Sequence, residues 1–150
     1  IDRVKFIDTV IKRHTDGLNH EDSMQQLDFP ANCMNWNLGH LLVYRMEYLG
    51  AIDGTTAPNE EEWAMYGAGS EPLTDSEAAI QLETLLNRLA EVSDLIVSAL
   101  ETVSAEQLDT VYNEERDMSL DDYLNFYLIF HEAYHAGQLE ILKELALAER

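Results

Sequence analysis

The sequence is poor in cysteine, proline and positive charge, and it lacks any long apolar run. Its 150 residues contain one cysteine, Cys33, so no intramolecular disulfide can form and a disulfide-stapled scaffold is excluded. No apolar segment approaches the roughly 20 residues needed to cross a bilayer. Charged residues interrupt every apolar stretch in residues 1–30, which therefore do not resemble a signal peptide. We expect a cytoplasmic protein that does not span a membrane.

The shortage of positive charge limits the partners of this chain. There are 9 Lys and Arg against 29 Asp and Glu, which gives a formal net charge of -20. Such a surface repels the phosphate backbone of nucleic acids and anionic membrane surfaces. Nucleic-acid binding through a basic patch is therefore excluded, and the remaining candidate partners are small molecules and other proteins.

The length and the apolar content predict one helical domain spanning residues 1–150. Hydrophobic residues make up 46% of the chain, which is close to the average of globular proteins. Apolar residues recur at steps of three and four in four segments, and none alternates convincingly with period two. All three prolines fall between these segments: Pro30, Pro58 and Pro72. The sequence therefore predicts an all-α fold, most simply a four-helix bundle.

The capping residues suggest where these helices begin and end. The first covers about residues 2–16, and the second runs from Asn32 or Asn35 to Gly50. The third begins at Thr74 or Asp75, where Thr74 and Glu77 form a capping box, and continues to about Thr102. The fourth begins at Ser119. The connection at 53–74 is long enough to cross the end of a bundle, and it has room for a short helical turn around Glu60 to Tyr66.

The predicted second helix is apolar over most of its circumference. A helix of this kind is either mostly buried or has one face in a second interface. A homodimer formed through this helix is therefore one expectation.

Two histidines on the fourth helix form the first candidate site. His131 and His135 are four residues apart, so both imidazoles lie on one helical face, within the apolar stripe that points into the core. Two unpaired imidazoles in an apolar core cost a few kcal/mol, and they repel each other when both are protonated. A divalent metal resolves both problems because it binds the neutral ring. The pair therefore indicates a metal site, although structural histidines remain the alternative.

Two ligands leave this site incomplete. The third could come from another histidine, from Cys33 or from a carboxylate. His40 is the best candidate by position because it lies within the apolar second helix. His14 ends the first helix and His20 lies in a polar connection, so both are expected to be solvated or capping residues. Cys33 is expected to be a small buried hydrophobe near a helix start.

Two sequence runs resemble the motifs of a known superfamily. The run from His131 to Gln138, HEAYHAGQ, is similar to the His-x-x-x-His-x-Gly-Gln signature on the last helix of the DinB/YfiT-like metalloenzymes. The run from Asn35 to Leu41, NWNLGHL, with Arg45 five positions after its histidine, resembles the second-helix motif of that superfamily. Ala136 departs from the pattern because many members carry a large basic residue there. The resemblance covers essentially the whole chain.

This resemblance implies an up-down-down-up four-helix bundle that holds one divalent ion by His40, His131 and His135. Three imidazoles leave positions open on the ion, which is typical of catalytic sites. The set does not distinguish sharply among zinc, nickel and iron, and zinc or nickel is expected. Described relatives include thiol-dependent S-transferases and a mycothiol-dependent isomerase. The resemblance therefore implies a transferase that uses a low-molecular-weight thiol or, second, a metal-dependent hydrolase. The alternative is a non-catalytic metal-binding or dimerising bundle.

Residues near the predicted ion are candidates for further roles. Glu47, Glu132 and Gln138 are the candidates for catalysis: the two glutamates as general bases, and Gln138 as a group that orients a ligand. Arg45 could anchor an anionic substrate or the carboxylate of a thiol cofactor, although a surface salt bridge would also account for it. The remaining candidates for lining a substrate site are Trp36, Tyr44 and Tyr134.

Overall fold

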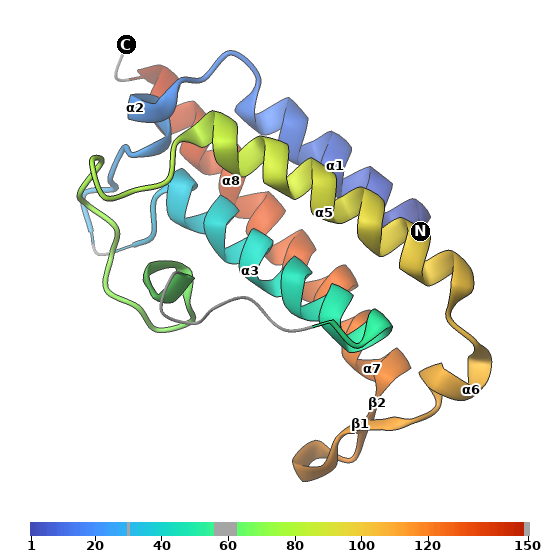
Figure 1. The fold of residues 1–150 in the computed structure, drawn as a ribbon. Coiled ribbons are helices and arrows are strands. Elements are labelled where there is room, and N and C mark those ends of the chain that lie inside the picture. Colours follow the sequence, from blue (N-terminus) through green and yellow to red (C-terminus); the bar gives the residue numbers. More distant parts are fainter. Residues whose placement is uncertain (30, 56–62, 149–150) are drawn as a thin grey trace.

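The computed structural model describes residues 1–29, 31–55 and 63–148 and is mostly helical (Figure 1). Four long stretches dominate it: α1 (Asp2–Thr15), α3 (Met34–Asp53), α5 (Leu82–Thr102), and the consecutive α7 (Leu120–Asn125), η3 (Phe126–His131) and α8 (Glu132–Ala148). The connections contain the short helices α2 (His20–Ser23), η1 (Ala64–Tyr66), α6 (Ala105–Leu108) and η2 (Glu114–Arg116). This confirms the all-α class. None of the described helices has the length and apolarity that a membrane crossing requires.

The long helices pack side by side, and α3 packs against both α5 and α8. α1 packs against α8 and α5. In Figure 1, α3 and α5 run in one direction along the molecule, and α1 and α8 run in the other. Buried apolar side chains from α1, α3, α5 and α8 form the larger core cluster, and a second cluster surrounds α7. One side of α3 therefore faces α8 across the interior.

The apolar circumference of α3 is covered within the chain itself. Thirteen of its twenty residues are buried. In addition to α5 and α8, side chains from the connection after α3 cover it, among them Trp63, Tyr66 and Leu73. The composition of this helix is thus accounted for without a second chain.

Two helices begin at other residues than the sequence predicts. Cys33 precedes α3, while Asn35 lies inside the helix, where its buried amide donates to the carbonyl of Ile80 at 2.8 Å. The predicted start of the third helix at Thr74 or Asp75 is wrong, because Asp75 caps only one turn and α5 begins at Leu82. The His20 ring accepts from the Leu82 N–H at 3.3 Å, so it performs the capping that the Thr74–Glu77 pair was expected to provide.

The connections contain short elements that the helical periodicity did not reveal. Strands β1 (Val111–Asn113) and β2 (Met118–Ser119) form a small antiparallel hairpin before α7, too short to show a period of two. The sequence predicts a helical turn around Glu60 to Tyr66. Residues 60–62 lie outside the described residues, and Ala64–Tyr66 form η1, which is one turn of 3₁₀ helix.

The fourth helical stretch contains a π turn just before the histidine pair. Its predicted start is confirmed, since the Ser119 side chain accepts from the Asp122 N–H. In η3 the hydrogen bonds reach one residue further than in an α-helix, as shown by the Glu132 N–H bonding to the carbonyl of Tyr127. The turn ends at His131. Such π turns occur frequently at functional sites.

Candidate metal centre

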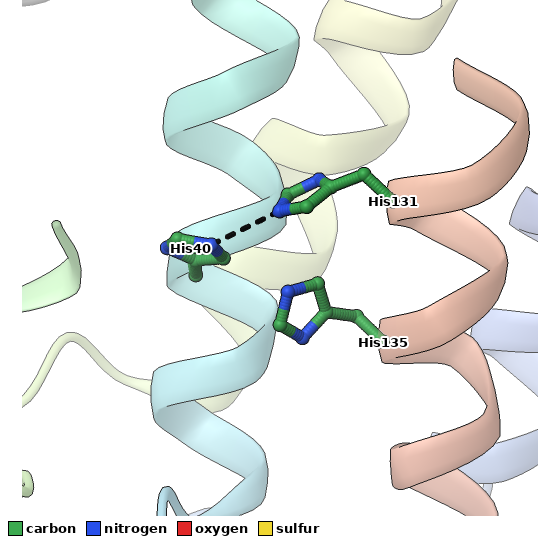
Figure 2. A group of neighbouring side chains, drawn as sticks. All are labelled: His40, His131 and His135. Carbon is green, nitrogen blue, oxygen red and sulfur yellow. Dashed lines mark hydrogen bonds between the residues drawn. The ribbon is translucent and has the colours of Figure 1, made fainter. Parts of the chain in front are cut away.

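His40, His131 and His135 meet between α3 and the η3–α8 stretch, where they point toward one another (Figure 2). Their nearest ligand atoms all lie within 4.8 Å of one another, and the Nε2 atoms of His40 and His131 are 3.2 Å apart. Two nitrogens bound to one tetrahedral zinc at about 2.0–2.1 Å are separated by about 3.3 Å. The side chains are therefore spaced to share one ion, and they form the only such group among the described residues.

Hydrogen bonds fix the tautomers of two of these rings. His40 Nδ1–H donates to the carbonyl of Tyr66 at 2.7 Å, which leaves Nε2 with a free electron pair. The side-chain NH₂ of Asn37 donates to the carbonyls of Asn32 and Cys33, so its oxygen must face His135 Nδ1, 2.8 Å away, and accept its proton. Both rings thus present an unprotonated Nε2, the form that binds metal.

His131 differs because neither of its nitrogens contacts a carbonyl or amide oxygen. Its Nδ1 lies 3.4 Å from the Tyr48 hydroxyl, which can donate or accept. Since His40 Nε2 carries no proton, the 3.2 Å contact is a bond donated by His131 Nε2–H in the metal-free protein. Binding of an ion therefore requires this one proton to leave Nε2.

Burial keeps all three imidazoles neutral. It lowers the pKa of His131 to about 4, with a further contribution from His40. It lowers the pKa of His135 to about 3, where His131 and His40 add to the effect and Gln138 opposes it. The pKa of His40 is also lowered by burial, against the opposing bond to Tyr66. No proton therefore has to be displaced from a charged imidazolium when metal binds near pH 7.

These lowered pKa values predict acid sensitivity of the metal-free protein. Below about pH 6.5 these histidines become protonated in the unfolded chain but stay neutral in the folded chain. The free energy of unfolding therefore falls as pH drops from about 6.5 toward 4. Urea unfolding in EDTA between pH 7 and pH 4 measures this. The double variant His131→Gln, His135→Gln should show a flatter dependence, and equal slopes for the two proteins would contradict the assignment.

Arg45 is buried in an ion-pair network instead of facing the histidines. Its guanidinium bonds both oxygens of Glu132 at 2.8 Å, and it also contacts Asp8 at 2.5 Å and the hydroxyl of Ser93. The side chains of Arg45 and Glu132 are both 0% exposed. Burial alone lowers the pKa of Arg45, but the Glu132 and Asp8 carboxylates raise it by more than burial lowers it. The pKa of Arg45 is therefore raised and the guanidinium stays charged.

This network leaves Arg45 and Glu132 unsuited to the roles expected of them. An anchor for an anionic substrate and a general base must each reach the substrate. Here both side chains are fully buried and bonded to each other, linking α3 to the first residue of α8. The surface salt bridge considered for Arg45 is instead an interior one, and we assign the pair a structural role.

The other candidates lie in three different environments. Trp36 is buried, stacks on the His40 ring at 4.5 Å and donates to the Ser70 hydroxyl, so it supports a ligand. Tyr44 and Glu47 are half-buried on α3, and the Tyr44 ring lies 4.5 Å from that of His131. The side-chain oxygen of Gln138 is buried without a hydrogen-bond partner among the described residues. Tyr134, in contrast, is 57% exposed.

The alternative third ligands do not join the group. Cys33 is buried with its thiol donating to the carbonyl of Leu73, and burial raises the pKa of that thiol. His20 bridges the carbonyl of Ser76 and the N–H of Leu82, and neither it nor His14 belongs to the three-histidine group.

Sequence reasoning missed the residues that orient the rings: Asn37, Tyr48 and Tyr66. Asn37 lies one turn before His40 within the run from Asn35 to Leu41, so its place beside the predicted ligand was a usable signal. Tyr66 contributes its backbone carbonyl from η1, and no residue type predicts such a contact.

The chain matches the model of a known family. The family model described as the DinB superfamily matches residues 10–139, which is most of the chain and includes all three histidines. A search of the curated proteins finds none that matches.

Proposed function

We propose that this chain, which belongs to the DinB superfamily, is a metal-dependent enzyme whose divalent ion is held by His40, His131 and His135. The observation that carries the proposal is the convergence of three neutral imidazoles from two helices to within 4.8 Å. Hydrogen bonds that His135 donates to the Asn37 side-chain oxygen and His40 donates to the Tyr66 carbonyl hold these two rings in the tautomer that binds metal.

The donor set fits an ion with open coordination positions. Three imidazoles without a thiolate or carboxylate do not distinguish sharply among zinc, nickel and iron, and we propose zinc or nickel. When bound, such an ion lowers the pKa of water or of a thiol, or polarises a carbonyl. The buried side-chain oxygen of Gln138 lies close enough to His135 to raise its pKa, so an acceptor is present beside the proposed ion.

For the reaction, we propose transfer involving a low-molecular-weight thiol, with metal-dependent hydrolysis as the second candidate. Glu47 is the general-base candidate that remains half-exposed, and Tyr44 and Trp36 line or support the site. The alternative of a non-catalytic, dimerising bundle was based on the apolar circumference of α3. Because α3 is covered within one chain, that observation no longer supports it. We also propose that residues 1–150 form one up-down-down-up bundle and that the protein is cytoplasmic, whereas the homodimer expected from the apolar second helix stays a prediction.

Elemental analysis of protein purified without an affinity tag tests the metal site. We expect one divalent ion per chain in the wild type, and loss of stoichiometric metal in His131→Ala with largely unchanged helix content by circular dichroism. His14→Ala is the matched control and should keep its metal, because His14 lies outside the group. Full occupancy in His131→Ala would show that the ligand assignment is wrong.

A panel of thiols then separates the two reactions. A thiol-dependent transferase should bind its thiol more tightly with metal than without, because the ion favours the thiolate. Equal binding in both forms favours the hydrolase.

A further inference from the structure

A group of tyrosines borders the open side of the histidine site. We call Tyr44, Tyr123 and Tyr127, together with Glu47, the tyrosine wall. Tyr44 stacks on Tyr127 at 5.3 Å, and Tyr127 lies 4.7 Å from Tyr123. Tyr44 and Tyr127 also approach the His131 ring, at 4.5 and 5.6 Å. These two tyrosines and His131 are only half-buried, so solvent reaches this side of the site, whereas His40 and His135 are buried.

Glu47 places a carboxylate beside these rings. It follows Tyr44 by three residues on α3, so the two side chains are neighbours on one helix face. Burial raises the pKa of Tyr44, and Glu47 raises it further. The same carboxylate adds to the effect of burial on Tyr123, which comes from α7. Glu47 therefore raises the pKa of tyrosines on both α3 and α7. These phenols stay uncharged, and their aromatic faces are electron-rich.

The charge distribution around the wall favours positive ligands. The whole chain carries 29 Asp and Glu against 9 Lys and Arg, and the single Lys or Arg on α3 is Arg45. That one cation is fully buried and bonded to Glu132 and Asp8, so it offers nothing to an anionic ligand. A surface of one sign raises the local concentration of ligands of the other sign.

We propose that the tyrosine wall binds an organic cation, an amine or quaternary ammonium on an apolar body, as the substrate class of the three-histidine site. Aromatic faces attract such cations by about 0.5–2 kcal/mol, and a nearby carboxylate adds to the attraction. The cationic end contacts the rings and Glu47, and the apolar body reaches toward His131. The assignment as a substrate rests on the proposed metal-dependent function, but the cation preference itself belongs to the wall.

Three probes of similar shape test the charge preference: 2-phenylethylamine, 2-phenylethanol and phenylacetate. Calorimetric titration is done on the full chain, both metal-free and loaded with zinc. We expect the amine to bind about tenfold more tightly than the acid and several-fold more tightly than the alcohol. Equal binding of amine and alcohol to the metal-free protein, or tighter binding of the acid to it, would overturn the proposal.

Matched variants locate the binding site. Glu47→Gln should weaken the amine about fivefold to tenfold and leave the alcohol unchanged. Glu140→Gln removes the same charge from an exposed position on α8 and should change neither. Tyr44→Phe keeps an aromatic face and should keep amine binding, whereas Tyr44→Leu should weaken it. If Glu47→Gln and Glu140→Gln weakened amine binding equally, the attraction would come from the acidic surface as a whole. That result would contradict a cation site at the tyrosine wall.

Metal content is measured separately on the same samples. Amine preference in a chain that holds no metal would overturn the proposed enzyme but leave the wall as a cation site. One bound metal per chain without amine preference would overturn the wall and leave the metal proposal intact.

Discussion

Replacing Glu132 by glutamine is expected to lower the free energy of unfolding by about 3–5 kcal/mol. The Glu132 carboxylate takes two hydrogen bonds from Arg45, and both side chains are fully buried. Glutamine has nearly the same shape but no charge, so the guanidinium would keep only Asp8 as a charged partner. A buried charge that loses its partner is far more costly than the intact pair is stabilising. Urea or thermal unfolding of the two proteins measures the difference.

Two further variants separate this explanation from a general sensitivity of the core. Asp8→Asn removes the partner that is 35% exposed, and it should cost clearly less than Glu132→Gln because water can reach that end of the network. The double variant Arg45→Met, Glu132→Leu removes both charges and should recover most of the lost stability. A double variant no more stable than Glu132→Gln would contradict the uncompensated-charge explanation.

Gly39→Ala is expected both to destabilise the fold and to weaken metal binding. A Cβ atom at Gly39 would lie 2.1–2.5 Å from ring atoms of Tyr66, so the ring must move. That ring is buried, and its hydroxyl bonds to Asn35 and to the N–H of Ile80, so it cannot simply swing away. We expect a loss of about 1–3 kcal/mol, as in other overpacked cores. Because the Tyr66 carbonyl orients His40, metal affinity should also fall about tenfold or more.

Gly137→Ala is the matched control for this change. Gly137 is exposed on α8, between His135 and Gln138, and a Cβ atom there meets nothing within 4 Å. Alanine in an open helical position should stabilise the fold by up to about 1 kcal/mol and leave metal affinity unchanged. Unfolding curves and a competitive zinc titration compare the variants. Similar behaviour of the two alanines would mean that contact with Tyr66 does not position His40.

Apolar periodicity was sufficient to predict the long helices, whereas the histidine spacing predicted only the pair His131 and His135, and the resemblance to the superfamily implied His40 as the third member. The buried face of the fourth stretch contains His135 because residues there that repeat at helical steps must point inward. The start of the third helix was not predictable in this way, because the Thr74–Glu77 pattern describes one local turn. The actual start at Leu82 depends on His20, 62 residues away in sequence.

Charged residues were the least predictable from sequence. Arg45 and Glu132 were expected near the surface or in the substrate site, because a charged side chain is costly to bury. The cost falls when several partners converge, and here they come from α1, α3, α5 and α8. Such convergence is a property of the tertiary structure and has no signature in the spacing along one helix.

The π turn in η3 has a geometric consequence for the whole centre. In a regular helix, residues four apart drift around the axis by about 40° at each step. Tyr123, Tyr127, His131 and His135 follow one another at steps of four, and a regular helix would spread them over about a third of its circumference. The wider turn of η3 lies between Tyr127 and His131 and offsets part of that drift at this step, where the two rings are 5.6 Å apart. A chain shortened by one residue here would keep both histidines at their spacing but rotate the aromatic rings before them out of register.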